Sequence, residues 1–168
     1  MSRSPIGFET QHGHTAPLCT QFSIFLDNRV GKLYELLESF DGQPLKIVAL
    51  SVVDSSDYAV VRLMTTSSEL TRRILNGAKH PFTQSEILVV ALERDKQLSR
   101  VCLSLLSAEL NIYYAYPLMV APHGEATLAI QTDDQVLAGQ ILQRKGFRIL
   151  GENELESYDD GDADDAMP

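Results

Sequence analysis

The sequence predicts an α+β fold made of two similar units, each with the element order strand, helix, strand, strand, helix, strand. Two observations carry this prediction: the element order occurs twice along the chain, and apolar residues recur at a fixed separation. The composition agrees with it, because 44% hydrophobic and 22% charged residues in a chain of 168 are typical of a globular protein. Each unit can therefore cover one face of a four-stranded antiparallel sheet with its two helices.

The first unit opens with the apolar run QFSIFL, which predicts a strand, and continues with a helix whose apolar residues form one stripe. The turn DGQP ends this helix, and two β-branched runs separated by SSD predict a hairpin. Serine and threonine caps precede a second helix that ends near Gly77. The expected elements are a strand at 21–26, a helix around 33–40, strands at 45–54 and 58–65, a helix around 67–77 and a strand at 86–93.

The same order then repeats in the second half of the chain. Its expected elements are a helix around 97–110, a strand at 111–120, a tight turn at 123–125, a strand at 126–132, a helix around 133–146 and a strand at 147–150. The repeat has a period of 65 residues, which separates Leu33 from Leu98, Ile47 from Ile112, Leu63 from Leu128 and Phe82 from Phe147.

Units with this element order are ferredoxin-like, and a unit of about 65 residues has only marginal stability by itself. We therefore expect the two units to pack together as one body, edge to edge or face to face. The expected division is an irregular N-terminal arm at 1–20, a first unit at 21–85, a second unit at 86–151 and an acidic, disordered tail at 152–168.

The distribution of charge argues against several classes of partner. The net charge is −9, and eight acidic residues with no Lys or Arg follow Arg148, so the rest of the chain is nearly neutral and lacks a basic surface for nucleic acid. No apolar run reaches the length of a membrane span, and the first residues have no signal-peptide pattern. Cys19 and Cys102 lie far apart and indicate neither a disulfide framework nor a metal cluster, so we expect a cytoplasmic protein.

The stretch FLDNRVGKLYELLESF, followed by IVALSVVDSSDYAVVRL, resembles the first repeat of the paired ACT domains, small regulatory modules that bind amino acids. Val30 stands where that family usually has proline. In the second half, ELNIYYAYPLM and LQRKGFRIL are similar to the second repeat, but Asp95 and Lys96 replace its Pro-Gly pair. The residues that match the family pattern are Asp27, Asn28, Arg29, Gly31, Leu33, Arg62 and Leu63, then Asn111, Ile112, Tyr114, Tyr116, Gly146 and Phe147.

The junction DNRVGKL can be interpreted as a plain turn or as a ligand loop. A glycine there permits positive φ and close approach of a ligand, and the first N–H groups of the helix can receive a carboxylate. Asn28 can bond either end of an amino acid, and Asp27 or open strand carbonyls can take the ammonium. The resemblance implies that SVVDSS lies near such a loop of another unit or chain. The expected ligand-binding residues are Leu26, Asp27, Asn28, Val30, Gly31, Lys32, Leu33, Ser51, Val52 and Asp54.

The other candidate groups favour structural roles. We expect the second loop, ERDKQL, not to bind an amino acid in the same way, because it lacks glycine and carries Asp95. His12 and His14 offer only two metal ligands. A strand places Tyr114 and Tyr116 on one face and Tyr113 on the other, which is the pattern of a packed strand. We expect Cys102 to be a small core residue.

The sequence thus favours a non-catalytic amino-acid sensor without metal or cofactor, assembled as a homodimer through sheet edges or helices. No nucleophile with its base and no phosphate-binding loop is visible. A ligand-free interaction protein that keeps the same fold is the main alternative. A ferredoxin-like hydrolase of the acylphosphatase type ranks last, because the basic pair Arg72 and Arg73 falls within an expected helix.

Overall fold

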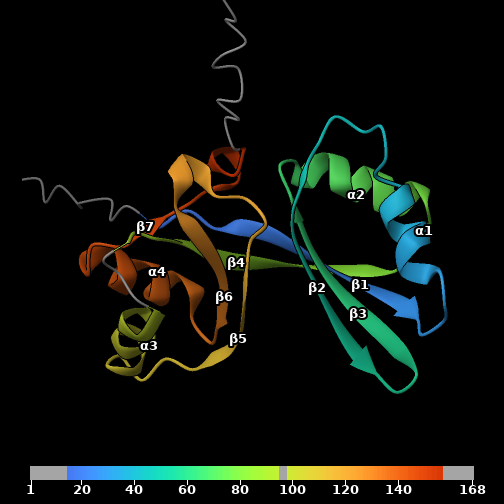
Figure 1. Cartoon of the computed structure of the whole chain (residues 1–168). Coiled ribbons are helices and arrows are strands. Elements are labelled where there is room, and N and C mark those ends of the chain that lie inside the picture. Colours follow the sequence, from blue (N-terminus) through green and yellow to red (C-terminus); the bar gives the residue numbers. More distant parts are fainter. Residues whose placement is uncertain (1–14, 95–97, 157–168) are drawn as a thin grey trace, which may run out of the picture.

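The computed structural model of the chain describes residues 15–94 and 98–156, which form an α+β fold with an antiparallel sheet (Figure 1). Its strand order is β2-β3-β1-β4-β6-β5, and β7 also pairs with β4. The α+β class and the paired ferredoxin-like units expected from the sequence are confirmed. The strands are β1 (Cys19–Asp27), β2 (Ile47–Ser55), β3 (Tyr58–Thr65), β4 (Phe82–Leu92), β5 (Ile112–Pro117), β6 (Ala126–Thr132) and β7 (Arg148–Ile149).

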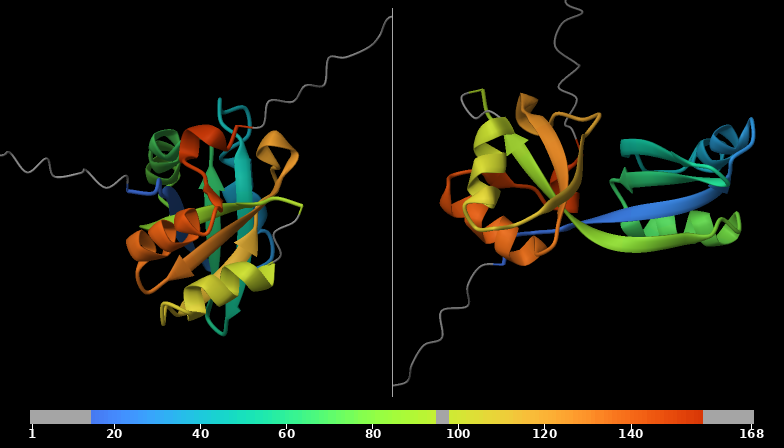
Figure 2. Two further views of the ribbon diagram at one scale, coloured as in Figure 1. Left: turned by 90° about the vertical axis from the view of Figure 1, so that its left-hand side faces the viewer. Right: turned by 90° about the horizontal axis from the view of Figure 1, so that it is seen from below.

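Strand β4 belongs to both units and runs from the first half of the sheet into the second (Figure 2). Its first half pairs with β1, from Ile24↔Phe82 to Cys19↔Ile87, and its second half pairs with β6 and β7. The sequence predicted a strand only from 86, because polar residues in FTQS hide the earlier part of the pattern. The expected boundary between residues 85 and 86 therefore falls within one continuous strand.

The helices cover one face of each half of the sheet. They are α1 (Lys32–Glu38), α2 (Ser68–Gly77), α3 (Leu98–Leu106) and α4 (Gln135–Arg144). Alternating residues of β1 and β3 pack under α1 and α2, as a strand with one buried face requires. The core of the first unit includes Phe22, Ile24, Leu36, Leu63 and Leu75, and the core of the second includes Leu88, Val90, Leu105, Ile130 and Leu142.

A third core lies between the two units, on the sheet faces that carry no helix. It joins Cys19, Met64 and Val48 of the first unit to Tyr116 and Ala129 of the second. The amide of Met119 also donates a hydrogen bond of 2.8 Å to the carbonyl of Val48. The units therefore share a strand and a buried interface, and each stabilises the other.

The ends of the described chain also join this body. Residues 152–156, which the sequence placed in the acidic tail, include a 3-10 helix η2 (Glu152–Glu154) and the fully buried Leu155. Another short 3-10 turn, η1 (Pro122–Gly124), precedes β6. Residues 1–14 and 157–168, where most of the expected arm and tail lie, are outside the described residues. None of the described helices is long and apolar enough to span a membrane.

Candidate functional site

The connection from β1 to α1 changes direction at a single glycine, Gly31. Gly31 has φ 90° and ψ −14° and stands at the N-cap of α1, so the left-handed conformation required there costs it little. Hydrogen bonds from the Arg29 amide to the Asp27 carbonyl and from the Glu35 amide to the Gly31 carbonyl hold the loop on either side. The side chain of Val30 is fully exposed at the tip.

Asn28 links this loop to the end of β2. Its Nδ2 donates a hydrogen bond of 2.9 Å to Oδ1 of Asp54. The two residues meet because Tyr58 of β3 lies opposite both Asp27 and Ser55, which places the ends of β1 and β2 on either side of it. The loop thus contacts the hairpin of its own unit, whereas the family resemblance implied a hairpin of another unit or chain. With Nδ2 engaged, the Oδ1 of Asn28 is the atom that can accept a hydrogen bond from a ligand ammonium.

Two exposed ion pairs balance the charge around the loop. Nη2 of Arg29 lies 3.6 Å from Oδ2 of Asp27, and Nζ of Lys32 lies 2.7 Å from Oε2 of Glu35. Pairs this exposed contribute little to stability, so either cation can exchange its partner for a ligand carboxylate at small cost.

The remaining expected site residues fall into separate environments. Leu26 is buried and Leu33 half-buried in the core beneath α1, where they support the loop from below. On β2, the alternation of a strand puts Val52 on the same face as Asp54 and puts Ser51 on the opposite face, level with Arg62. The structure therefore brings the loop, Val52 and Asp54 to one side of the sheet and places Ser51 on the other.

The second unit has a cavity of about 690 Å³ beside its own strand-to-helix connection. Arg94, His123 and Glu125 contribute to its lining, and Nη2 of Arg148 binds Oε2 of Glu125 at 2.6 Å. Sequence reasoning missed this cavity because HGE reads simply as a tight turn. The one signal available in the sequence was the His123-Gly124 pair. In the structure both residues of this turn have positive φ. Asp95 and Lys96, on which the expectation for this loop rested, lie outside the described residues.

A buried polar cluster between the units was also missed. Gln21 is fully buried, its Nε2 donates to the Tyr114 hydroxyl at 2.8 Å, and its Oε1 accepts from the Tyr116 hydroxyl at 2.5 Å. The two tyrosine rings are stacked, and the Arg62 guanidinium lies 3.7 Å from the centre of the Tyr114 ring. Burial raises the pKa of the Tyr116 hydroxyl far above its ordinary value, so the phenol stays protonated as a donor. This cluster joins the units through one buried and one partly buried hydrogen bond.

The other candidate groups have ordinary environments. Cys102 was expected in the core but is exposed, because Val101 and Leu105 form the face of α3 that packs on the sheet. In α2, Nε of Arg72 donates to Gln84, and Arg73 pairs with Glu69. His12 and His14 lie outside the described residues, and within residues 15–94 and 98–156 no group of three or more metal-ligating side chains occurs.

Comparisons with known proteins agree with this architecture. Protein BT0572 from Bacteroides thetaiotaomicron has a similar structure over 83% of this chain and 96% of its own, with a TM-score of 0.74 and 20% identity. The ligand-free regulatory subunit of aspartate kinase from Thermus thermophilus matches 77% of this chain and 93% of its own, with a TM-score of 0.51 and 7% identity. At these identities the likeness concerns the fold. A search of curated proteins gives no match.

A family model described as an ACT domain pair matches residues 18–158. That range includes both units, the shared strand β4 and the C-terminal segment that packs between the units. It confirms the resemblance drawn from DNRVGKL and the repeated element order. The chain therefore belongs to the family of ACT domain pairs.

Proposed function

We propose that this protein is a non-catalytic regulatory module that binds a free amino acid at the β1–α1 loop of its first unit. Membership in the ACT domain pair family supports the regulatory class, and one protein of similar fold is itself the regulatory subunit of a kinase. The two free, widely separated thiols in the described chain are consistent with a reducing cytoplasm.

The observation that carries the proposal is the contact between Asn28 and Asp54 beside Gly31. It holds an amide oxygen and a carboxylate close to a backbone turn that has no Cβ to keep a ligand away. An ammonium group can bond the oxygens of Asn28 and Asp54, and the carboxylate of the same amino acid can bond Lys32 or Arg29. Such a ligand is held by both strand ends, so it stabilises the loop and the hairpin together.

We propose further that a second copy of the chain completes this site. Strand β2 stands at one end of the strand order, and its residues Val52 and Val53 are 49% and 41% exposed. An unpaired edge with exposed apolar residues is a surface on which another strand can pair. Pairing at β2 covers Val52, which lies on the same side of the sheet as Asp54, and gives the ligand side chain a wall. Ligand binding then favours one arrangement of the two copies, which a regulated partner can recognise.

A ligand-free interaction protein is the second candidate. Val30 occupies the tip of the loop with its whole side chain in solvent, where the family usually has proline. This departure from the family pattern, rather than the exposure of a single valine, favours the ligand-free candidate.

Thermal unfolding in the presence of each proteinogenic amino acid at millimolar concentration tests the proposal. A ligand present at 100 times its dissociation constant adds about 2.7 kcal/mol to the free energy of unfolding, which raises the midpoint by roughly a few degrees. We expect one or two amino acids to do so, Asn28→Ala to abolish the shift, and the matched control Asn76→Ala in α2 to retain it. A flat result across the whole set supports the interaction protein instead.

A further inference from the structure

Two adjoining cavities lie on the first unit, at the connection between α1 and β2. The first has a volume of about 310 Å³ and the second about 390 Å³, and Leu45 and Lys46 line both of them. We call the surface that they form together the α1–β2 groove. Its other lining residues are Pro44, Thr66 and Glu156 in the first cavity and Leu37, Phe40, Asp41 and Ile47 in the second.

The floor of the α1–β2 groove is largely apolar. Leu37, Leu45 and Ile47 are half-buried, and Pro44 is exposed. Leu45 and Ile47 pack against the core beneath α1, and the part of each side chain that stays exposed faces the groove. An apolar surface left in water is stabilised when another apolar group covers it.

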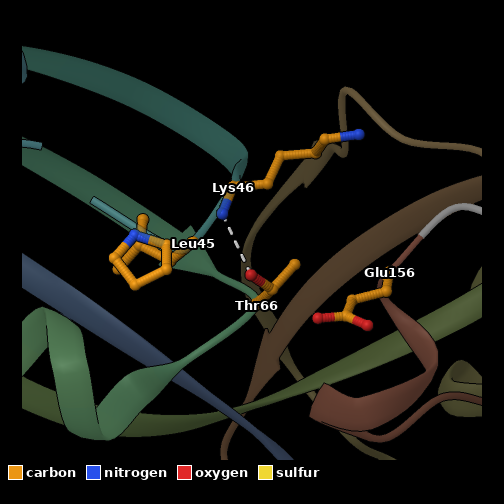
Figure 3. A pocket seen from close by; sticks show the side chains of 5 residues that line it. Leu45, Lys46, Thr66 and Glu156 are labelled. Carbon is orange, nitrogen blue, oxygen red and sulfur yellow. Dashed lines mark hydrogen bonds between the residues drawn. The ribbon is translucent and has the colours of Figure 1, made fainter. Parts of the chain in front are cut away.

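The first cavity also offers a hydroxyl group. The Lys46 amide donates a hydrogen bond of 3.0 Å to the Thr66 hydroxyl oxygen, and the Thr66 amide donates one of 3.0 Å to the Lys46 carbonyl. Figure 3 shows that the Lys46 side chain leads away from Thr66 and Glu156, so its ammonium does not face the cavity. The Thr66 hydroxyl is held in place by its acceptor bond and can still donate a hydrogen bond of its own.

The C-terminal segment reaches the edge of this groove. Glu152 accepts a hydrogen bond of 2.7 Å from the amide of Ser68 at the start of α2, and Leu155 is fully buried in the core shared by the units. Glu156 follows directly, and its carboxylate faces Thr66 across the first cavity (Figure 3). The described part of the chain ends here, so the residues that follow Glu156 start beside the groove.

Tyr158 is the residue of that continuation best suited to an apolar surface. It follows Glu156 by two residues, which span at most about 7 Å. Asp159 and Asp160 come next, and no further large apolar side chain occurs before Met167. The family model of an ACT domain pair also matches as far as residue 158. Position and side chain therefore single out Tyr158 as the group that can cover the groove.

The chemistry of the first cavity fits a tyrosine. A buried tyrosine needs an apolar surface for its ring and a partner for its hydroxyl. Pro44 and Leu45 provide the surface, and the Thr66 hydroxyl provides the partner. A carboxylate would lose hydration on the same floor and would be repelled by Glu156. The cavity thus suits the phenol of Tyr158 better than it suits the acidic side chains that follow.

We propose that the α1–β2 groove is the docking site of the chain's own C-terminal continuation, with the ring of Tyr158 packed on Pro44 and Leu45. The Tyr158 hydroxyl accepts a hydrogen bond from Thr66. This contact ties the α1–β2 connection of the first unit to the segment that follows the second unit. The groove is open to another protein only when the segment leaves it, so the segment acts as a removable cover.

NMR spectroscopy of the full-length protein with labelled leucine methyl groups tests this docking, in the absence of any added amino acid. We expect nuclear Overhauser contacts between the Tyr158 ring and the Leu45 methyl groups. Tyr158→Ser should remove these contacts together with the ring-current shift of the Leu45 methyls. Tyr158→Phe should keep both, because it retains the ring. Tyr113→Ser is the matched control, since it removes an exposed tyrosine from β5 and should leave the Leu45 signals unchanged.

Two results would overturn the proposal. Leu45 signals that are the same in Tyr158→Ser and in the unaltered protein would show that the ring does not cover the groove. Contacts that are lost on dilution, or that appear between a labelled and an unlabelled copy, would assign the groove to a second copy of the chain instead. Circular dichroism of each variant shows that the fold is kept, so that a changed Leu45 signal reports on the groove.

Discussion

At the scale of single residues, Gly139 in α4 shows how closely the chain before β1 packs on the second unit. A Cβ at this position would lie 2.6 Å from the Cβ of Ala16 and 3.2 Å from Cδ1 of Leu88. We expect Gly139→Ala to lower the free energy of unfolding by about 1–3 kcal/mol, because overpacking outweighs the better helix propensity of alanine. Gly77 in α2 is the matched control, since a Cβ there meets nothing within 4 Å. Urea denaturation of both variants measures the difference, and equal stability would show that the contact with Ala16 is wrong.

The two described cysteines should differ in reactivity, because Cys19 is buried and Cys102 is exposed. Burial, together with the carboxylates of Glu152 and Glu154, raises the pKa of the Cys19 thiol from 9.0 to about 12. Below the ordinary value the thiol is protonated in both states, so its contribution to stability is complete there. Above that value the unfolded chain ionises first, and the free energy of unfolding falls until the pH reaches the folded pKa.

We therefore expect the protein to lose about 1.4 kcal/mol through this thiol at about pH 10 compared with neutral pH. Urea denaturation at both pH values should show a loss that is smaller by this amount in Cys19→Ala. A thiol reagent should modify exposed Cys102 rapidly and Cys19 only on unfolding. Equal reaction of both thiols in the native protein would contradict the burial of Cys19.

At the scale of elements, the start of α2 depends on a residue from the C-terminal segment, which follows the second unit. The Ser67 side chain caps the helix by accepting a hydrogen bond from the Leu70 amide. The Glu152 carboxylate accepts a hydrogen bond from the Ser68 amide. A carboxylate at a helix N-terminus is stabilised by the helix dipole as well as by its hydrogen bond. We expect Glu152→Gln to cost about 0.3–1 kcal/mol and Glu152→Ala somewhat more, with faster amide hydrogen exchange in the first turn of α2.

Asp134→Ala gives the control for that experiment, because Asp134 caps α4 through the Leu137 amide within one unit. Its effect on exchange should remain in α4, whereas the effect of Glu152→Ala should appear in α2, far away in sequence. If Glu152→Ala leaves exchange in α2 unchanged, the C-terminal segment does not help to hold the first unit.

The elements also show which parts of the fold could be predicted from sequence. The helices and the β2–β3 hairpin follow from local patterns: an apolar stripe, serine and threonine caps, and two β-branched runs around a turn. The first half of β4 does not, because Thr83 and Gln84 are exposed polar residues whose strand conformation comes from pairing with β1. The loop around Gly31 was visible as a sequence motif. The buried contact between Gln21 and Tyr116 was not, because these residues are 95 positions apart and meet only after the units dock.

At the scale of the whole molecule, the shared strand and the buried polar cluster should make the two units unfold together. Tyr116→Phe leaves the fully buried Oε1 of Gln21 without its donor, which typically costs about 1–3 kcal/mol. Tyr113→Phe is the control, since Tyr113 lies on the same strand but is 60% exposed. We expect one cooperative transition in both variants, with a lower midpoint only for Tyr116→Phe. Two separate transitions would show that the units are independent.

The central claim is that an amino acid binds at the β1–α1 loop, and amide-resolved NMR titration tests it most directly. For the amino acid that stabilises the protein in the thermal screen, we predict saturable shift changes at Asn28, Val30 and Gly31 and at Asp54 of β2. Asn28→Ala should remove these changes and Asn76→Ala should not. Shift changes that avoid both the loop and Asp54, or that persist in Asn28→Ala, would contradict the assignment of this loop as the ligand site.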